Sequence, residues 1–112
     1  MLNWDTVRSY HAHLYYNLTQ LDQVNQIRAG VEKEFQVALG RVHQVPVGPH
    51  PGPSMQIAFA KADFAKLVTW LMANRGDIDV LVHVLTGDDI EDHTRGVMWL
   101  GKSYELNLEA LR

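Results

Sequence analysis

Alternating apolar and polar residues predict the strands of this chain. Residues 8–16 are rich in aromatic residues and residues 78–85 in aliphatic ones, and in a strand successive residues face opposite sides of the sheet. Shorter runs at 41–45 and 54–60 predict two further strands, and the alternation at 104–108 predicts a small extra one.

Apolar residues spaced by three and four predict two amphipathic helices. One spans residues 21–39, with Gly40 as its stop, and the other spans residues 64–71. A short helix is expected at 92–100. All four prolines fall between residues 46 and 53, which predicts a stiff loop because proline fixes its own φ.

The resulting order of strand, helix, strand, strand, helix, strand predicts a single α+β domain over residues 1–112. It is typical of a ferredoxin-like β-α-β-β-α-β sandwich, here with a short C-terminal extension. Both helices then cover one face of the sheet, and the first strand lies between the third and the fourth. The aliphatic residues face the helices, so the opposite face carries His11, His13 and His83 together.

This histidine-bearing face of the sheet needs a cover. It is open to solvent or paired with a second subunit, and it also carries the apolar residues Leu81, Leu85 and Tyr15. Because monomeric proteins rarely expose a large apolar patch, the pattern predicts a homodimer.

Composition narrows the classes of function. With 46% hydrophobic and 21% charged residues, the 112-residue chain has the composition of one folded domain. A net charge of −3 without a basic run argues against a nucleic-acid partner and against an anionic membrane. The chain has no cysteine, so any metal must bind nitrogen and oxygen ligands. It has no basic start, apolar leader or membrane-spanning run, which predicts a cytoplasmic protein.

The three histidines of the predicted sheet face form the leading candidate site. Imidazole is the commonest protein metal ligand, and three ligands that leave open positions suit non-haem iron(II). The same trio could hold catalytic zinc. Alternatively, His11 and His13 are ordinary surface or interface histidines, and His83 is a satisfied core residue within a valine-rich strand.

Two further histidines are candidates for acid–base chemistry. His50 lies in the proline-rich loop, which would hold it in place, although it could simply cap a neighbouring element. His93 follows an acidic cluster and could cap the short helix. That cluster is either a solvated loop or a source of a carboxylate that binds the metal or orients a histidine; it comprises Asp88, Asp89, Glu91 and Asp92. Arg75 could cap its helix or bind a substrate carboxylate in a bidentate fork.

Several segments together resemble one family. They occur in the same order from about Tyr10 to Gly101: His11-Ala12-His13-Leu14-Tyr15-Tyr16, Pro46-Val47-Gly48-Pro49-His50-Pro51, Gln56-Ile57-Ala58-Phe59, Trp70-Leu71 with Asn74-Arg75-Gly76, Val80-Leu81-Val82-His83, Thr86-Gly87-Asp88, Asp92-His93-Thr94 and Trp99-Leu100-Gly101. These resemble the DOPA 4,5-dioxygenase family of small fungal and bacterial proteins. Two places depart from the family pattern: Val84 stands where a proline is expected, and Gly52-Pro53-Ser54 replaces a more apolar stretch.

The resemblance implies a compact α+β fold, often dimeric, and extradiol cleavage of a catechol such as L-DOPA with non-haem iron(II) and dioxygen. On this interpretation His11, His13 and His83 bind the metal, and His50 moves protons, with His93 as the second choice. The expected substrate-binding residues are Arg75, Tyr15 and Trp99. A different hypothesis is a dimeric, ferredoxin-like binding or sensing module that binds metal or a small aromatic acid without turnover. Oxygen consumption with a catechol and iron(II) separates the two.

Overall fold

Five strands form one antiparallel sheet in the computed structural model, which describes residues 2–112. Their order across the sheet is β2-β3-β1-β4-β5. The central strand β1 pairs with β3 and β4, as the sequence predicts. The bounds are β1 Ser9–Tyr15, β2 Ala38–Leu39, β3 Ser54–Ala60, β4 Asp79–Val84 and β5 Val97–Leu100.

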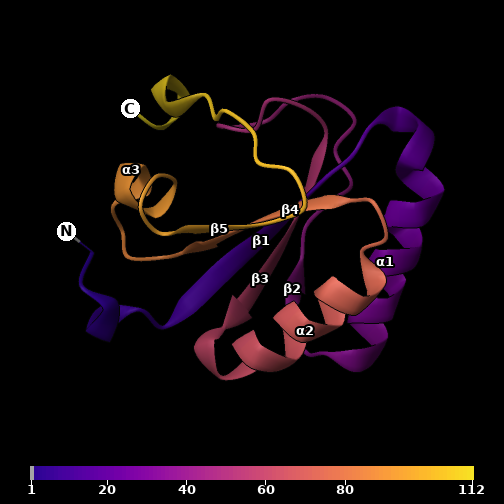
Figure 1. The fold of residues 1–112 in the computed structure, drawn as a ribbon, viewed down its shortest axis with the longest axis horizontal. Helices are drawn as coiled ribbons and strands as arrows, with labels where there is room; N and C mark the ends of the chain where they lie inside the picture. The colour runs from indigo at the N-terminus through magenta and orange to yellow at the C-terminus, as the bar shows by residue number, and fades with distance from the viewer. Residues whose placement is uncertain (1) are drawn as a thin grey trace.

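Two long helices, α1 (Leu21–Glu34) and α2 (Phe64–Asn74), cover one face of this sheet (Figure 1). The third helix, α3 (Asp89–Asp92), has four residues and lies on the other side, near the end of the chain. Short 3-10 turns complete the chain: Trp4–Thr6, Leu18–Gln20, Lys61–Asp63 and Leu108–Leu111. In the described part of the chain, no helix is long and apolar enough to cross a membrane.

The core lies between the sheet and the two long helices. Alternate residues of β1, such as Ala12 and Leu14, point into it and are completely buried. The helices contribute residues at spacings of three and four, which is the period of one helix face. The buried core consists of Ala12, Leu14, Tyr16, Val24, Ile27, Val31, Met55, Ile57, Phe59, Leu67, Val68, Leu71, Ile78, Val80, Val82 and Leu100.

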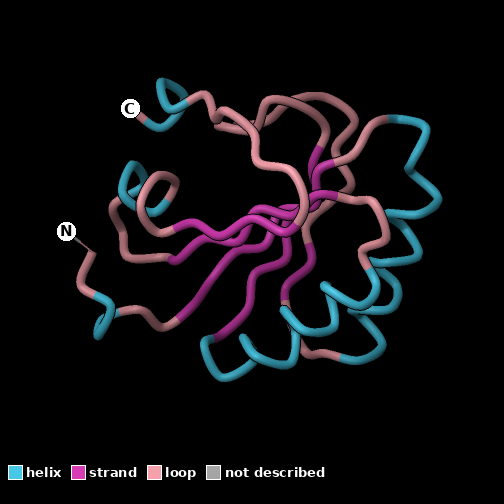
Figure 2. Tube along the Cα trace, in the orientation of Figure 1, coloured by secondary structure: helices cyan, strands magenta, loops and turns pink. Residues whose placement is uncertain are grey.

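The chain itself covers much of the opposite face. Figure 2 shows loops gathered on the side away from the long helices; they comprise the segment between β2 and β3, the surroundings of α3, and the C-terminal segment. Leu81 and Tyr15 on this face are already buried, at 0% and 5% exposure. The apolar surface that suggested a second subunit is therefore reduced within one chain, and the homodimer stays a prediction.

The first helix is shorter than the sequence pattern predicts. A helix over 21–39 is wrong, because α1 ends at Glu34 and Phe35 is already extended, with φ −134° and ψ 150°. Residues 38 and 39 instead form β2 against β3. The predicted strand at 41–45 is also wrong, and the edge strand lies just before it. Apolar residues at 35, 37 and 39 alternate, and positions 35 and 39 also fit a helix, so the two periods coincide here.

The C-terminal part differs from the prediction as well. The expected helix at 92–100 is wrong: α3 ends at Asp92, and Val97–Leu100 forms β5, in which Trp99 pairs with Leu81. The expected strand at 104–108 is not formed. The α+β class is confirmed, whereas the ferredoxin-like arrangement in detail stays a prediction because β5 extends the sheet.

Candidate metal centre

Three histidines meet on the sheet face opposite the helices. His11 on β1 pairs directly with His83 on β4, and His13 lies two residues further along β1 on the same face. One nitrogen of each ring lies within 4.8 Å of the others. The register of two neighbouring strands therefore brings together the trio that the sequence placed on one face, and these residues could hold a metal ion.

One distance within the trio fits a metal centre. The Nε2 atoms of His13 and His83 are 3.0 Å apart. Two nitrogen ligands about 2.1 Å from a metal and at right angles to each other are separated by about 3.0 Å. His13 and His83 are buried, at 4% and 1% exposure, whereas His11 is only partly buried. The donor set is thus anchored on one side and accessible on the other.

The protonation state of the trio suits metal binding. The Nδ1–H of His83 donates to the Val84 carbonyl over 2.8 Å, so its Nε2 carries the lone pair. Burial is the main cause that lowers the pKa of His83, to about 4, and the neighbouring histidines lower it further. Burial also lowers the pKa of His13 well below its ordinary value. Neutral imidazoles are the form that binds metals.

His50 reaches the trio from the proline-rich loop. Its backbone N–H donates to the Val47 carbonyl over 3.1 Å, closing a turn in which Gly48 has a φ of 54°. The carbonyl of Pro49 accepts from the Asn107 N–H over 2.8 Å, which ties the loop to the C-terminal segment. The ring of His50 lies 4.1 Å from that of His13, centroid to centroid. Burial is the main cause that lowers the pKa of His50 to about 4.

Tyr15 contacts His50 directly. Its hydroxyl lies 2.6 Å from the Nδ1 of His50. Burial raises the pKa of Tyr15, so its hydroxyl keeps its proton. The rings of Trp99 and Tyr104 pack against Tyr15, with centroids 5.7 Å and 5.0 Å away. Tyr15, Trp99 and Tyr104 thus form an aromatic wall beside His50.

His93 approaches the trio from the end of α3. It follows α3, its Nδ1–H donates to the Asp89 carbonyl over 2.7 Å, and its ring centroid lies 4.1 Å from that of His83. The buried carboxylate of Asp92 accepts from the backbone N–H of Thr86 over 2.9 Å and from its hydroxyl. Asp88 caps α3 through the Glu91 N–H. Two acidic residues therefore position α3 and its histidine, and the histidine trio contains no carboxylate.

The remaining sequence candidates lie in different places. Trp99 is beside Tyr15, close to His50. The Nη1 of Arg75 donates to the Ile78 carbonyl over 2.8 Å at the end of α2, and its role in substrate binding stays a prediction. Tyr104 was missed, because the alternation at 104–108 suggested only a strand. Its hydroxyl donates to Asp79 Oδ2 over 2.6 Å, a contact that no sequence spacing reveals.

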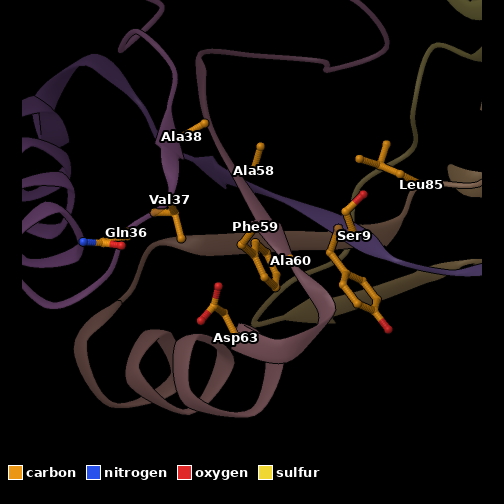
Figure 3. A pocket seen from close by; sticks show the side chains of 10 residues that line it. Ser9, Gln36, Val37, Ala38, Ala58, Phe59, Ala60, Asp63 and Leu85 are labelled. Atoms are coloured by element: carbon orange, nitrogen blue, oxygen red, sulfur yellow. The ribbon is translucent and has the colours of Figure 1, made fainter.

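Two hollows of the described residues differ in how close they lie to the site. A cavity of about 180 Å³ lies between the proline-rich loop and the aromatic wall, lined by Tyr15, Tyr16, Pro51, Gly52, Pro53 and Tyr104. A broader hollow of about 650 Å³ lies at the far end of β1 and β3 (Figure 3). No histidine lines it, so its size does not mark the candidate chemistry.

Comparison with known proteins decides the family. The model of the Dopa 4,5-dioxygenase family matches residues 10–110. The chain belongs to this family. It is 33% identical to the DOPA 4,5-dioxygenase of Amanita muscaria over 114 aligned positions, which cover 94% of this chain and 50% of that protein. An uncharacterized 21.2 kDa protein of Botryotinia fuckeliana is 27% identical over 93% of this chain and 63% of its own length.

A solved structure is similar over the whole chain. The crystal structure of a candidate dioxygenase from Nostoc punctiforme, at 1.46 Å resolution, has a TM-score of 0.95 and 40% identity. The match covers 100% of this chain and 97% of that one. The chain spans between half and two thirds of the length of the two fungal relatives. The chain is thus a member of the Dopa 4,5-dioxygenase family whose histidine trio could hold a metal.

Proposed function

We propose that this chain cleaves a catechol such as L-DOPA by extradiol opening, with iron(II) held by His11, His13 and His83. One observation carries the proposal: in a member of the Dopa 4,5-dioxygenase family, three histidines bring their ligand atoms within 4.8 Å. Extradiol cleavage breaks the ring bond between one hydroxyl-bearing carbon and its neighbour without a hydroxyl, and it places both atoms of dioxygen in the product. Bound iron(II) would supply the coordination of both substrates and the redox chemistry that dioxygen requires.

The residues around the trio support binding of an aromatic substrate. Tyr15 lines the cavity of about 180 Å³, and its hydroxyl contacts His50. An apolar cavity of about 150 Å³ is large enough for benzene, so this one has room for an aromatic ring or its side chain. Tyr15, Trp99 and Tyr104 offer ring faces and edges to such a group. We propose that the catechol lies between this aromatic wall and the trio.

Proton movement falls to the flanking histidines. The rings of His50 and His93 each lie 4.1 Å, centroid to centroid, from a ring of the trio, one from His13 and the other from His83. Ring opening of a catechol removes protons from its hydroxyl groups and returns a proton later, which is the work of positioned acid–base groups. His50 and His93 are the acid–base groups closest to the trio.

A second copy of the chain stays a proposed partner, which sedimentation equilibrium at micromolar concentration tests.

Oxygen uptake tests this function. The purified chain is loaded with iron(II) without oxygen and then mixed with L-DOPA in aerated buffer. We expect oxygen uptake equal to the catechol consumed, and a product heavier than the substrate by one molecule of dioxygen. The zinc-loaded chain is the matched control, which binds the catechol and consumes no oxygen. Catechol binding by the iron-loaded chain without oxygen uptake would overturn the proposal in favour of a binding or sensing module.

A further inference from the structure

The two histidines that flank the trio form different hydrogen bonds. Each uses its Nδ1 to bond to a group of the protein: His93 to the Asp89 carbonyl at 2.7 Å, and His50 to the Tyr15 hydroxyl at 2.6 Å. A neutral imidazole carries one hydrogen on its two nitrogens, so the bond at Nδ1 decides what Nε2 presents. The partners of the two rings therefore matter.

The partner of His93 fixes which of its ring nitrogens carries the hydrogen. A backbone carbonyl can only accept a hydrogen bond, so the Nδ1 of His93 must carry the hydrogen and donate it. The Nε2 of the neutral ring then has a lone pair and no hydrogen. This ring presents an acceptor at its free nitrogen.

The partner of His50 leads to the opposite result. Tyr15 is 5% exposed, and its hydroxyl hydrogen needs an acceptor because buried polar groups are almost always paired. Among residues 2–112, this hydroxyl bonds to the Nδ1 of His50. Tyr15 thus donates, Nδ1 accepts, and the hydrogen of the neutral His50 ring is on Nε2. This ring presents a donor at its free nitrogen.

Both free nitrogens are available to a small molecule. In the described residues, the buried side-chain polar atom without a hydrogen-bond partner is Glu91 Oε2. The unpaired Nε2 atoms of His50 and His93 are therefore not sealed inside the protein. The ring of His50 contacts that of His13, and the ring of His93 contacts that of His83.

We propose that the site has a fixed hydrogen-bond polarity, with a donor at His50 Nε2 and an acceptor at His93 Nε2, and that Tyr15 is the positioning residue for His50. Its consequence for substrate orientation rests on the proposed function. A catechol that has lost one proton has one neutral hydroxyl and one anionic oxygen. Its hydroxyl is directed to His93 and its anionic oxygen to His50, so the substrate binds in one of its two orientations.

Nitrogen-15 NMR of the histidine rings tests the polarity without turnover. The spectra are recorded on the zinc-loaded chain, which is diamagnetic, and on the metal-free chain. His50→Gln and His93→Gln, each of which lacks one set of ring signals, provide the assignments. We expect the hydrogen of His50 on Nε2 and that of His93 on Nδ1. Two rings with the same tautomer would overturn the proposal.

A pair of tyrosine variants tests the role of Tyr15. In Tyr15→Phe the Nδ1 resonance of His50 should move to the value of a nitrogen without a hydrogen bond, while His93 stays unchanged. Tyr104→Phe is the matched control, because its hydroxyl is in the same aromatic wall but bonds to Asp79 instead of a histidine. It should leave both rings unchanged. An unmoved His50 resonance in Tyr15→Phe would remove Tyr15 from this role.

Kinetics then separate this proposal from the proposed function. In the iron-loaded chain, Tyr15→Phe should lower kcat by about 10- to 100-fold, the usual effect of losing a partner that orients a functional histidine, with little change in KM. A raised KM with unchanged kcat would instead make Tyr15 a substrate-binding residue. If the NMR result holds but the wild-type chain consumes no oxygen, the proposed function fails and the polarity stands.

Discussion

The two faces of the sheet come from alternate residues of the same strands and are stabilised in different ways. Leu14 and its aliphatic neighbours are buried against two long helices. One residue earlier, His13 is almost as buried, at 4%, but it lies among imidazole rings and loops. Burial of apolar surface stabilises the first face, whereas hydrogen bonds position the rings of the second. Substitutions on the two faces should therefore separate stability from chemistry.

The largest effect is expected for the metal content of His13→Ala. Loss of a ligand should weaken metal binding by more than about 100-fold, because losing a residue that merely supports a ligand already costs 10- to 100-fold. Elemental analysis and oxygen uptake measure the result. The matched control is Gln56→Ala, since Gln56 is the partner of His13 across β1 and β3 and has no imidazole. Full metal loading of His13→Ala would show that the assigned ligand set is wrong.

His50→Ala should separate proton transfer from metal binding on the same face. Turnover should fall by about 10²–10⁴-fold, the usual contribution of a positioned acid–base group, while bound iron stays the same. His43→Ala, on the same loop, is the control and should retain turnover. A fall in iron content that matches the loss of activity would make His50 a ligand. Unchanged turnover would leave the role to His93.

Leu14→Ala should have its effect on the helix-facing side. The truncation leaves a cavity beneath α1 and α2 and should lower the free energy of unfolding by about 2–5 kcal/mol. Urea denaturation measures it, with Leu18→Ala as the control because Leu18 is 53% exposed. The folded fraction should still bind its full complement of metal. A loss of metal without a loss of stability would contradict the division between the two faces.

The smallest effect is expected in the loop that carries His50. Gly48 has a φ of 54° and no atom near the position of a Cβ, so Gly48→Ala adds backbone strain without a clash. It should cost about 1–2 kcal/mol, the penalty of a left-handed conformation for other residues. Gly52→Ala is the control in the same loop, where the backbone has no positive φ. Equal stabilities of the two variants, measured by thermal unfolding, would exclude strain at this turn.

The sheet and the histidine trio could be predicted because they follow from periodic patterns. Alternation in β1 and β4 identifies which residues share a face, and pairing of the two strands brings His83 next to His11. The positions of His50 and His93 could not be predicted this way. Loops have no period, and their course depends on single contacts, such as Asn107 to Pro49 and Thr86 to Asp92. The strands β2 and β5 were missed because two to four residues carry too little pattern to distinguish strand from helix.

The attachment of α3 has a consequence for the local stability of the segment that carries His93. A helix of four residues has no stability of its own, because forming the first turn costs more than it returns. Its position depends on the hydrogen bonds between Asp92 and Thr86. Segments held by few contacts open far more often than the whole domain unfolds. We therefore expect local opening of α3 to move His93, and amide hydrogens of α3 to exchange with solvent before those of β1 and β4.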